Sequence, residues 1–249
     1  GAGALRSSRT WAPILYRPPP LGKGGAAAPG RSVGRAPAGP HLRTGRASGY
    51  RGSMFPFATC AEPGCSALAL SGSGRCAAHL ADRAAFTAAR VADLASGAEP
   101  IEDLDLSGLE FVGLSLEGRS FRGCRFAGST FRNSSFAGAA LRLCFFDFAS
   151  FDSCDLSGLD AQYCSFAGST FHDVSFENSE LVHNNFDGIS TESCTFNYSN
   201  LYNSRFVRAR FARTDFVDCN LKKAYFLLTS EEEVSWKYSN TQEAVRDPD

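Results

Sequence analysis

The sequence of 249 residues lacks any long apolar run. Without a stretch of about 18 consecutive apolar residues, a transmembrane helix is excluded. The formal net charge is only −1, which excludes a uniformly basic nucleic-acid-binding protein. Acidic residues are missing from residues 1–53, which hold nine Lys/Arg, so the other 196 residues carry 16 basic and 26 acidic groups. The chain therefore consists of unlike parts.

Residues 1–53 are rich in Gly, Ala, Pro and Arg and show no hydrophobic period, which predicts disorder. Three interpretations are open: a basic tail that contacts nucleic acid or anionic lipid, an organelle-targeting segment, or non-native sequence. We favour the third, because the only methionine, Met54, stands where sequence typical of ordered structure begins.

Residues 54–80 contain four soft metal ligands in the pattern C-x4-C-x10-C-x2-H: Cys60, Cys65, Cys76 and His79. Thiolate and imidazole suit tetrahedral zinc, and a structural metal would replace a core that is too small to form. Pro63 and Gly64 supply a turn between the first two ligands. The pattern predicts a zinc-binding module, and the alternative is a set of ordinary reduced cysteines beside a surface histidine.

Residues 81–100 should form a helix and a linker. Ala84, Ala88, Val91 and Ala95 recur at helical spacing, which predicts one amphipathic helix over 81–96. Pro100 prevents its continuation.

Every fifth residue from Ile101 to Phe226 is large and apolar. Of these 26 positions, 16 are Phe, seven are Leu and one is Ile; only Ala161 and Thr191 depart. We call them the centre positions.

A period of five fits neither a helix nor a flat strand, so the chain must bend once per pentad to keep each centre residue inside. Residues two before the centres are small or medium from Cys124 to Val174, and glycine recurs two after many centres, where a corner would use its positive φ. Pairing one large with one small inward residue fills the interior and leaves no cavity for a substrate.

Sorting the centre positions at intervals of twenty indicates four sides per turn. The column that begins at Ile101 holds one Phe in seven positions, whereas the other three columns hold 15 in 19. The stretches 126–131 and 166–171, both F-A-G-S-T-F, resemble the A-(D/N)-L-x-x pattern of pentapeptide-repeat proteins. This resemblance implies a β solenoid, a right-handed quadrilateral parallel β-helix, over residues 101–228. With 26 repeats it would have about 6.5 turns and a length of roughly 31 Å.

Both ends of such a rod need caps. The helix over 81–96 should cover the first turn. In residues 229–249, Ser230 and Glu233 spell a capping box, which predicts a short C-terminal cap helix; dimerisation through this segment is the alternative.

The nine cysteines divide into three in the proposed metal module and six at small inward positions: Cys124, Cys144, Cys154, Cys164, Cys194 and Cys219. Buried cysteines used as small apolar residues indicate free thiols in a reducing compartment such as the cytoplasm.

Catalysis needs polar groups that converge in a pocket, and a filled rod offers flat sides instead. His172 and His183 fall at outward positions, and Asp147, Asp152, Asp155 and Asp160 become ordinary surface charge. We therefore predict that the protein is not an enzyme. No direct binding to nucleic acid is expected.

The surface offers two features for binding. Between residues 143 and 204 there are nine Asp/Glu and no Lys/Arg. Leu143, Phe145, Phe148 and Tyr163 are large apolar residues at non-core positions, and they form either a contact patch or a local bulge that turns inward.

Two function classes follow. The leading prediction is a scaffold that binds a protein partner through the sides of the rod. The family resemblance implies the alternative, because some members are similar to DNA in size and charge and inhibit type II topoisomerases such as DNA gyrase. A mimic of DNA needs a long acidic side, whereas this rod is short and has a basic end, with six Lys/Arg against two Asp between residues 205 and 223.

Overall fold

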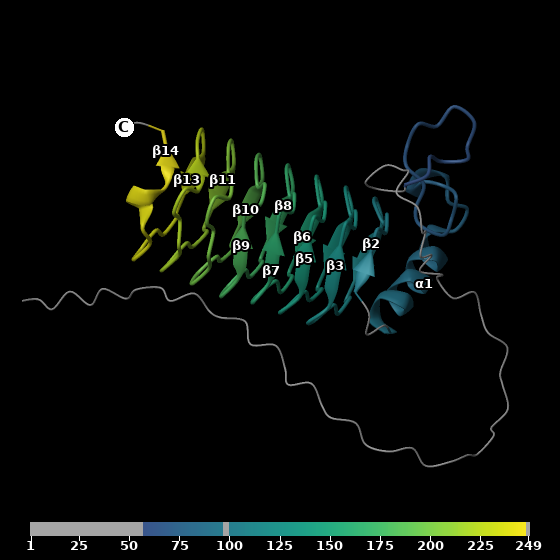
Figure 1. Cartoon of the computed structure of the whole chain (residues 1–249), viewed down its shortest axis with the longest axis horizontal. Coiled ribbons are helices and arrows are strands. Elements are labelled where there is room, and N and C mark those ends of the chain that lie inside the picture. Colours follow the sequence, from purple (N-terminus) through teal and green to yellow (C-terminus); the bar gives the residue numbers. More distant parts are fainter. Residues whose placement is uncertain (1–56, 97–99, 248–249) are drawn as a thin grey trace, which may run out of the picture. The chain divides into compact units, whose positions relative to one another are not determined.

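The structure of the chain is a computed structural model that describes residues 57–96 and 100–247 (Figure 1). The predictions for residues 1–53 lie outside this range. The helical elements are η1 (Ala77–His79), α1 (Arg83–Ser96) and η2 (Thr241–Glu243). The strands are β1 (Ile101–Glu102), β2 (Glu110–Val112), β3 (Ser120–Arg122), β4 (Thr130–Arg132), β5 (Ala140–Arg142), β6 (Ser150–Asp152), β7 (Asp160–Gln162), β8 (Thr170–His172), β9 (Glu180–Val182), β10 (Ser190–Glu192), β11 (Arg210–Ala212), β12 (Tyr225–Phe226), β13 (Ser230–Glu232) and β14 (Val245–Arg246).

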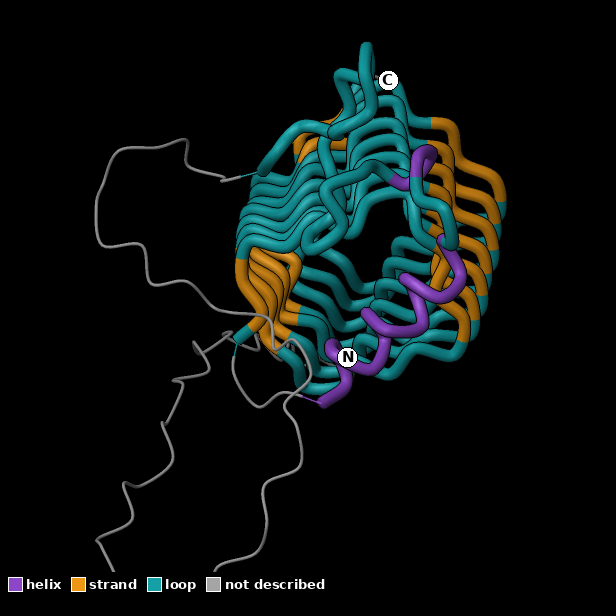
Figure 2. Tube along the Cα trace, turned by 90° about the vertical axis from the view of Figure 1, so that its right-hand side faces the viewer, coloured by secondary structure: helices purple, strands orange, loops and turns teal. Residues whose placement is uncertain are grey.

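The strands form a parallel β solenoid in which each residue pairs with the residue twenty positions later. One side is the sheet β1-β3-β5-β7-β9, and the opposite side is the sheet β13-β11-β10-β8-β6-β4-β2 (Figure 2). The two remaining sides are held by single parallel bridges at the same interval, such as Arg125↔Phe145 and Ser135↔Asp155, and the pair β12-β14 continues the first of these sides at its C-terminal end. The four sides predicted from the sorting of the centre residues are thus confirmed.

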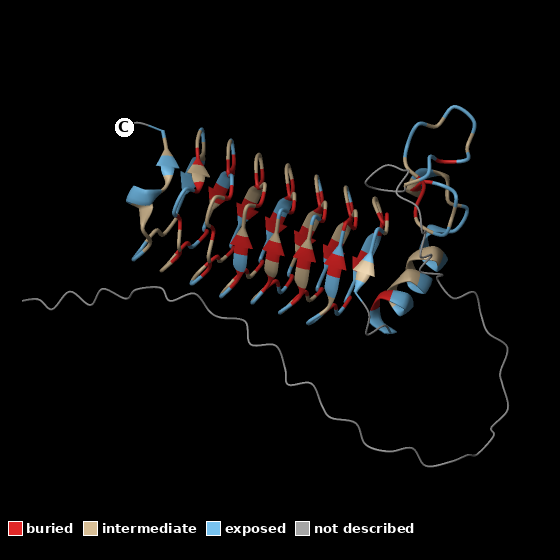
Figure 3. Cartoon of the chain, in the orientation of Figure 1, coloured by how far each residue is buried: buried red, intermediate tan, exposed pale blue. Residues whose placement is uncertain are grey.

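The interior is a set of stacked aromatic columns. Along one column, Phe126 through Phe226, successive rings lie 4.7–5.0 Å apart and within 9° of parallel. Neighbouring columns meet edge to face, as Phe131 and Phe136 do at 5.2 Å. Full burial of each ring contributes about 1.5–3 kcal/mol, and each ring pair about 0.5–1.5 kcal/mol more. The buried residues form a continuous line through the turns (Figure 3).

The small inward residues do more than fill space. The hydroxyl of Ser169 donates a hydrogen bond to the Phe146 carbonyl at 2.6 Å and accepts one from the Ala149 N–H at 3.1 Å. Cys219 occupies an equivalent position, and its thiol donates to the Phe196 carbonyl at 3.0 Å. These side chains therefore add a hydrogen bond between turns to corner backbone groups that already pair within their own turn, as the Ala149 N–H does with the Phe146 carbonyl at 3.0 Å. This role explains why Ser and Cys are frequent at a position where Ala would fit.

The N-terminal cap is the predicted helix, which begins at Arg83. Asp82 caps it, because its Oδ1 accepts a hydrogen bond from the Ala85 N–H at 2.8 Å. Leu94 is buried in the solenoid core, and Phe86 and Val91 pack against that core. Among the described residues, no helix is long and apolar enough to cross a membrane.

The predicted short C-terminal helix is wrong, because the solenoid continues through that segment. Ser230 donates its N–H to the Ala209 carbonyl at 3.0 Å, and Glu231 pairs with Phe211 in register. Stacking on the preceding turn thus uses the backbone groups that a helix would need, and only the short η2 is helical. From Ile101 to Arg246 the coil makes about seven turns of twenty residues, rather than 6.5.

The last turn carries a polar and aromatic cap. Trp236 stacks on Phe216 with ring centroids 4.4 Å apart, and its Nε1 donates to Glu231 Oε2 at 2.9 Å. Arg246 pairs with Glu231 and lies 4.5 Å from the centre of the Trp236 ring. The ion pair occupies two centre positions, so the final turn places charge where earlier turns place Phe. This closure within the chain favours capping over dimerisation at this end.

We predict that Ser169→Ala lowers the free energy of unfolding by about 0.5–1.5 kcal/mol, because it removes the hydrogen bonds of a buried hydroxyl to the Phe146 carbonyl and from the Ala149 N–H, while the backbone bond between these two groups remains. Chemical denaturation measures this loss. Ser150→Ala, at an outward position of β6, is the matched control and should be nearly neutral. Equal losses in the two variants would contradict the role assigned to the inward hydroxyl.

We predict that the six solenoid cysteines resist alkylation in the native protein at pH 8. Their side chains are at most 4% exposed, and burial raises the pKa of Cys194 and of Cys219 to about 11. Mass spectrometry after iodoacetamide treatment should find them modified only once the chain is unfolded. Native labelling at the rate of the unfolded chain would show that these thiols reach solvent.

Candidate functional site

Four potential metal ligands come together in the segment that precedes the solenoid. Cys60 ends a short extended stretch that is held by the antiparallel bridge Thr59↔Leu68. Cys65 follows the predicted turn, in which the Cys65 N–H donates to the Glu62 carbonyl at 3.0 Å. Cys76 immediately precedes η1, and His79 is the last residue of η1. The sequence pattern is therefore brought together by one tight turn and one short helix.

The ligand atoms have the spacing of a tetrahedral site. Nδ1 of His79 lies 3.5 Å from Cys60 Sγ and 3.3 Å from Cys76 Sγ, and the sulfurs of Cys65 and Cys76 are 3.9 Å apart. All four ligand atoms lie within 4.8 Å of one another. Metal–sulfur bonds of about 2.3 Å and metal–nitrogen bonds of about 2.0 Å in a tetrahedron place ligand atoms roughly 3.5–3.8 Å apart. The cluster can therefore hold a metal ion.

Backbone hydrogen bonds favour the thiolate form of Cys60. The Cys76 N–H, which donates to Cys60 Sγ at 3.4 Å, and then the backbone at Glu62 lower the pKa of Cys60 to about 6. A thiol with this pKa is mostly ionised at neutral pH, and the thiolate is the form that binds metals.

This metal-ligand segment docks on the first turn of the solenoid. The Ser71 N–H donates to the Asp105 carbonyl at 2.9 Å, and Ser71 Oγ accepts from the Asp105 N–H at 2.8 Å. Leu70 is buried in the same core cluster as the solenoid residues. The segment thus provides hydrogen bonds that a preceding turn would provide, so it shares the capping of this end with α1.

The apolar surface residues face solvent, and the inward bulge is wrong. Leu143, Phe148 and Tyr163 are 40%, 76% and 57% exposed, and Phe145 is half-buried. Phe145 keeps its bridges to Arg125 and Ser165, so the register is unbroken here. Of the two alternatives, an inward bulge and a surface patch, the structure has the surface patch. We call these four residues the apolar patch.

The patch lies on the side of the solenoid formed by the bridges through Arg125, Phe145, Ser165 and Asn185, which we call the Phe145 side. Leu143 and Tyr163 stand at one corner of this side, and Phe148 stands at the other; all three have positive φ. The Phe148 ring covers Gly168, where an added Cβ would lie 2.6 Å from ring carbons. A side chain at position 168 would therefore displace this ring.

Two further aromatic residues extend the patch. The rings of Tyr163 and His183 stack at 5.0 Å and 4°, and Tyr202 meets His183 edge to face at 5.6 Å. Nδ1 of His183 also lies 2.7 Å from Asn203 Nδ2. Sequence reasoning did not add His183 to the patch, although its position twenty residues after Tyr163 is the signal that could have found it.

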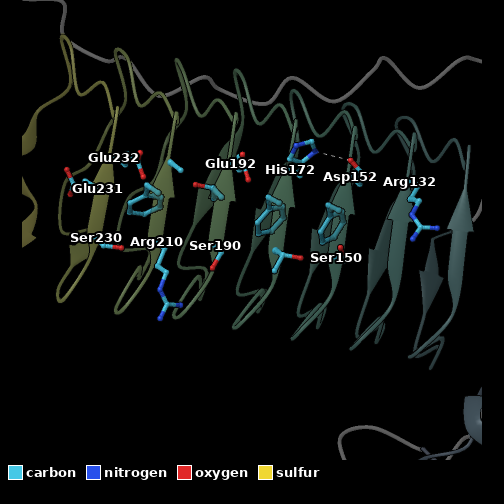
Figure 4. Close-up of a pocket in the computed structure, with 16 residues that line it drawn as sticks. Arg132, Ser150, Asp152, His172, Ser190, Glu192, Arg210, Ser230, Glu231 and Glu232 are labelled. Atoms are coloured by element: carbon cyan, nitrogen blue, oxygen red, sulfur yellow. Dashed lines mark hydrogen bonds and ion pairs between the residues drawn. The ribbon is translucent and has the colours of Figure 1, made fainter.

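The side of the solenoid that follows the Phe148 corner offers a shallow groove rather than a catalytic cleft. It runs over β6, β8, β10, β11 and β13 with a volume of about 790 Å³ (Figure 4). Within it, His172 Nδ1 and Asp152 Oδ1 lie 3.1 Å apart, with both side chains about half exposed. Figure 4 places the hydroxyls of Ser150 and Ser190 along the groove without an interaction to His172. The pair is therefore solvated and does not activate a neighbouring hydroxyl.

The nine carboxylates between residues 143 and 204 encircle the solenoid instead of lining one side. The twenty-residue register distributes them over all four sides: Asp160 and Glu180; Asp147 and Asp187; Asp152, Asp173 and Glu192; and Asp155 and Glu177. Three form ion pairs with arginines: Asp160 with Arg142, Asp187 with Arg205, and Glu192 with Arg213. The acidic stretch therefore does not present a continuous acidic side.

Comparison with known proteins agrees with this architecture. The model of the pentapeptide-repeat family matches residues 110–147, 149–188 and 192–226 with eight copies. Two structures of trypsin-treated variants of QnrB1, a plasmid-mediated fluoroquinolone resistance protein, are similar in fold. They are 18% and 19% identical, cover 60% of this chain and 84% and 82% of their own chains, and each has a TM-score of 0.52. No significant match was found among curated proteins. The family model and the four-sided solenoid together show that residues 110–226 are a pentapeptide-repeat region.

Proposed function

We propose that this protein is a non-enzymatic interaction protein that binds a protein partner through the sides of its solenoid. The observation that carries the proposal is the apolar patch: three large side chains stand 40–76% exposed in the middle of the rod, although the interior has room only for its own rings. Exposed apolar groups that lie together are typical of surfaces that another molecule covers. The free, buried cysteines favour a reducing compartment such as the cytoplasm.

A DNA-mimicking modulator of a type II topoisomerase is the second candidate. The fold likeness to QnrB1, a fluoroquinolone resistance protein, favours it. The arrangement of charge weighs against it, because the carboxylates are spread over four sides and several are neutralised by arginines. A surface that replaces DNA needs regularly spaced negative charge along one side, as the phosphates provide.

The metal-ligand segment is proposed to hold a structural zinc ion. Three thiolates and one imidazole at tetrahedral spacing are a donor set that zinc prefers, and all four positions are filled by protein ligands. The ion would stabilise the segment that docks on Asp105 and would thereby protect the first turn of the solenoid.

We predict that a photoreactive phenylalanine analogue at position Phe148 crosslinks one protein partner in the native host. The same analogue at Tyr238, an equally exposed residue near the C-terminal end, is the matched control and should not capture that partner. Mass spectrometry identifies the product. Identical products from the two positions, or none from Phe148, would remove the patch as the binding surface.

We predict that the purified full chain does not inhibit DNA supercoiling by gyrase at low micromolar concentration. We expect no inhibition because the carboxylates are spread over four sides and form no continuous acidic side. An agarose-gel supercoiling assay measures the inhibition. Strong inhibition would instead make the topoisomerase candidate the leading one.

We predict that the purified protein contains about one zinc ion per chain, the content of one four-ligand site. Cys76→Ser should lose the metal and lower the temperature of unfolding, because the docked segment shares the N-terminal cap. Cys194→Ser, in the core, should keep the metal. Elemental analysis and thermal unfolding test both statements. A protein without zinc, with unchanged stability in Cys60→Ser, would contradict the metal site.

A further inference from the structure

The apolar patch and its aromatic extension form one continuous surface along a corner of the solenoid. Leu143, Tyr163 and His183 stand at the same corner position of three successive turns, and Tyr163 and His183 are in direct ring contact. The strand spacing of about 4.8 Å per turn makes this row about 10 Å long. We call this row of three residues the corner ridge.

In the middle turn of the patch, the Phe145 side next to the corner ridge carries only small outward side chains and is therefore flat. There the outward residues are Ser165 and Ala167, followed by Gly168 at the next corner. Phe148 closes the far edge by lying over Gly168. A partner that contacts the ridge and Phe148 together would therefore meet a shallow floor between two apolar edges.

Three ion pairs involve arginines that border this surface. Arg142 pairs with Asp160 at 2.5 Å, and Arg125 pairs with the buried Asp105 at 3.3 Å. Across the Phe145 side, Asp187 is likewise paired with Arg205, at 2.8 Å. None of these arginines has an unpaired charge to offer to an acidic partner.

Asp147 is the remaining charge on the floor, and it lies between Phe145 and Phe148. It accepts a hydrogen bond from the Ser165 hydroxyl and forms no ion pair within the described part of the chain. The surface thus combines exposed apolar edges with one uncompensated carboxylate, inside a stretch of 62 residues without Lys or Arg.

The other exposed large apolar residues stand elsewhere on the solenoid. Val112 pairs in register with Arg132, Tyr198 stands at a different corner, and Leu228, Tyr238 and Val245 belong to the last turns. A second copy of this chain is disfavoured as the occupant of the Phe145 side, because a symmetric contact would place two uncompensated Asp147 carboxylates in one interface.

We infer that the Phe145 side binds a cationic amphipathic segment of a partner protein, whose apolar side chains cover the corner ridge and Phe148 and whose Lys or Arg pairs with Asp147. This inference rests on the proposed function and specifies the chemistry of the partner. Apolar contact provides the area, and the carboxylate selects the sign of the charge.

The test uses the full chain and two labelled helical peptides of the same length, one with a Leu/Lys pattern and one with a Leu/Glu pattern. Fluorescence anisotropy should detect binding of the Leu/Lys peptide alone, with an affinity that falls as salt is raised. Asp147→Asn should weaken binding about three- to ten-fold, as expected for loss of one partly exposed charge pair. Phe148→Ser combined with Tyr163→Ser should abolish it.

Tyr238→Ser is the matched control and should bind as the unaltered protein does. All altered positions face outward, and thermal unfolding checks that each variant keeps its fold. Equal binding of the two peptides, or binding of the Leu/Lys peptide that the patch variants leave unchanged, overturns the inference. An outcome in which position 148 still crosslinks a partner while the Leu/Lys peptide fails to bind rejects the cationic chemistry and keeps the proposed function.

A peptide of residues 1–53, which holds nine Lys/Arg, serves as a competitor in the same assay. Displacement of the Leu/Lys peptide by this segment would show that the surface is occupied by the chain's own basic segment, which overturns the assignment to a separate partner protein. Absence of displacement supports that assignment.

Discussion

The parallel pairing of each residue with the residue twenty positions later is the constraint on which the rest of this structure depends. It places Phe on Phe at 4.7–5.0 Å along a column, and it places Tyr163 on His183 on the outside by the same rule. Because backbone hydrogen bonds set the register, a change at one position affects chiefly the turns above and below it. Interior order and surface pattern thus have a single cause.

The same constraint makes the two ends the places where the repeat must change. At the first turn, Ser71 supplies the hydrogen bonds to Asp105 that a preceding turn would supply. At the last turn, Glu231 and Arg246 take up centre positions and form an ion pair beside Trp236. Both ends use polar contacts, because the final ring faces water and no further turn can cover it. The metal-ligand segment belongs to this capping, which connects its proposed zinc to the stability of the solenoid.

Because the interior is filled, a ligand or partner can bind only on the outside of the solenoid. With the rings in contact, chemistry is left to residues that stand on corners and sides, where His172 and Asp152 remain solvated. The architecture therefore supports the binding of a partner that is complementary to its surface in shape and charge. The apolar patch beside the unpaired Asp147 is a stronger candidate than the ring of carboxylates, because apolar contact survives physiological salt while exposed charge is screened.

Much of the molecule followed from sequence alone. The five-residue period and the sorting at twenty determined the solenoid and its four sides, since large apolar residues recur at almost every centre position and Phe avoids one of the four columns. The spacing of Cys60, Cys65, Cys76 and His79 predicted the cluster that the structure brings together. The end of the repeat was misjudged, because Ser230 and Glu233 satisfy a local helix rule while their backbone groups pair with the turn before. Tertiary structure alone decided that Ser169 serves as a hydrogen-bond donor, that Phe148 lies over Gly168, and which carboxylates arginines neutralise. Each of these depends on contacts between turns, and a linear pattern does not contain the geometry of such contacts.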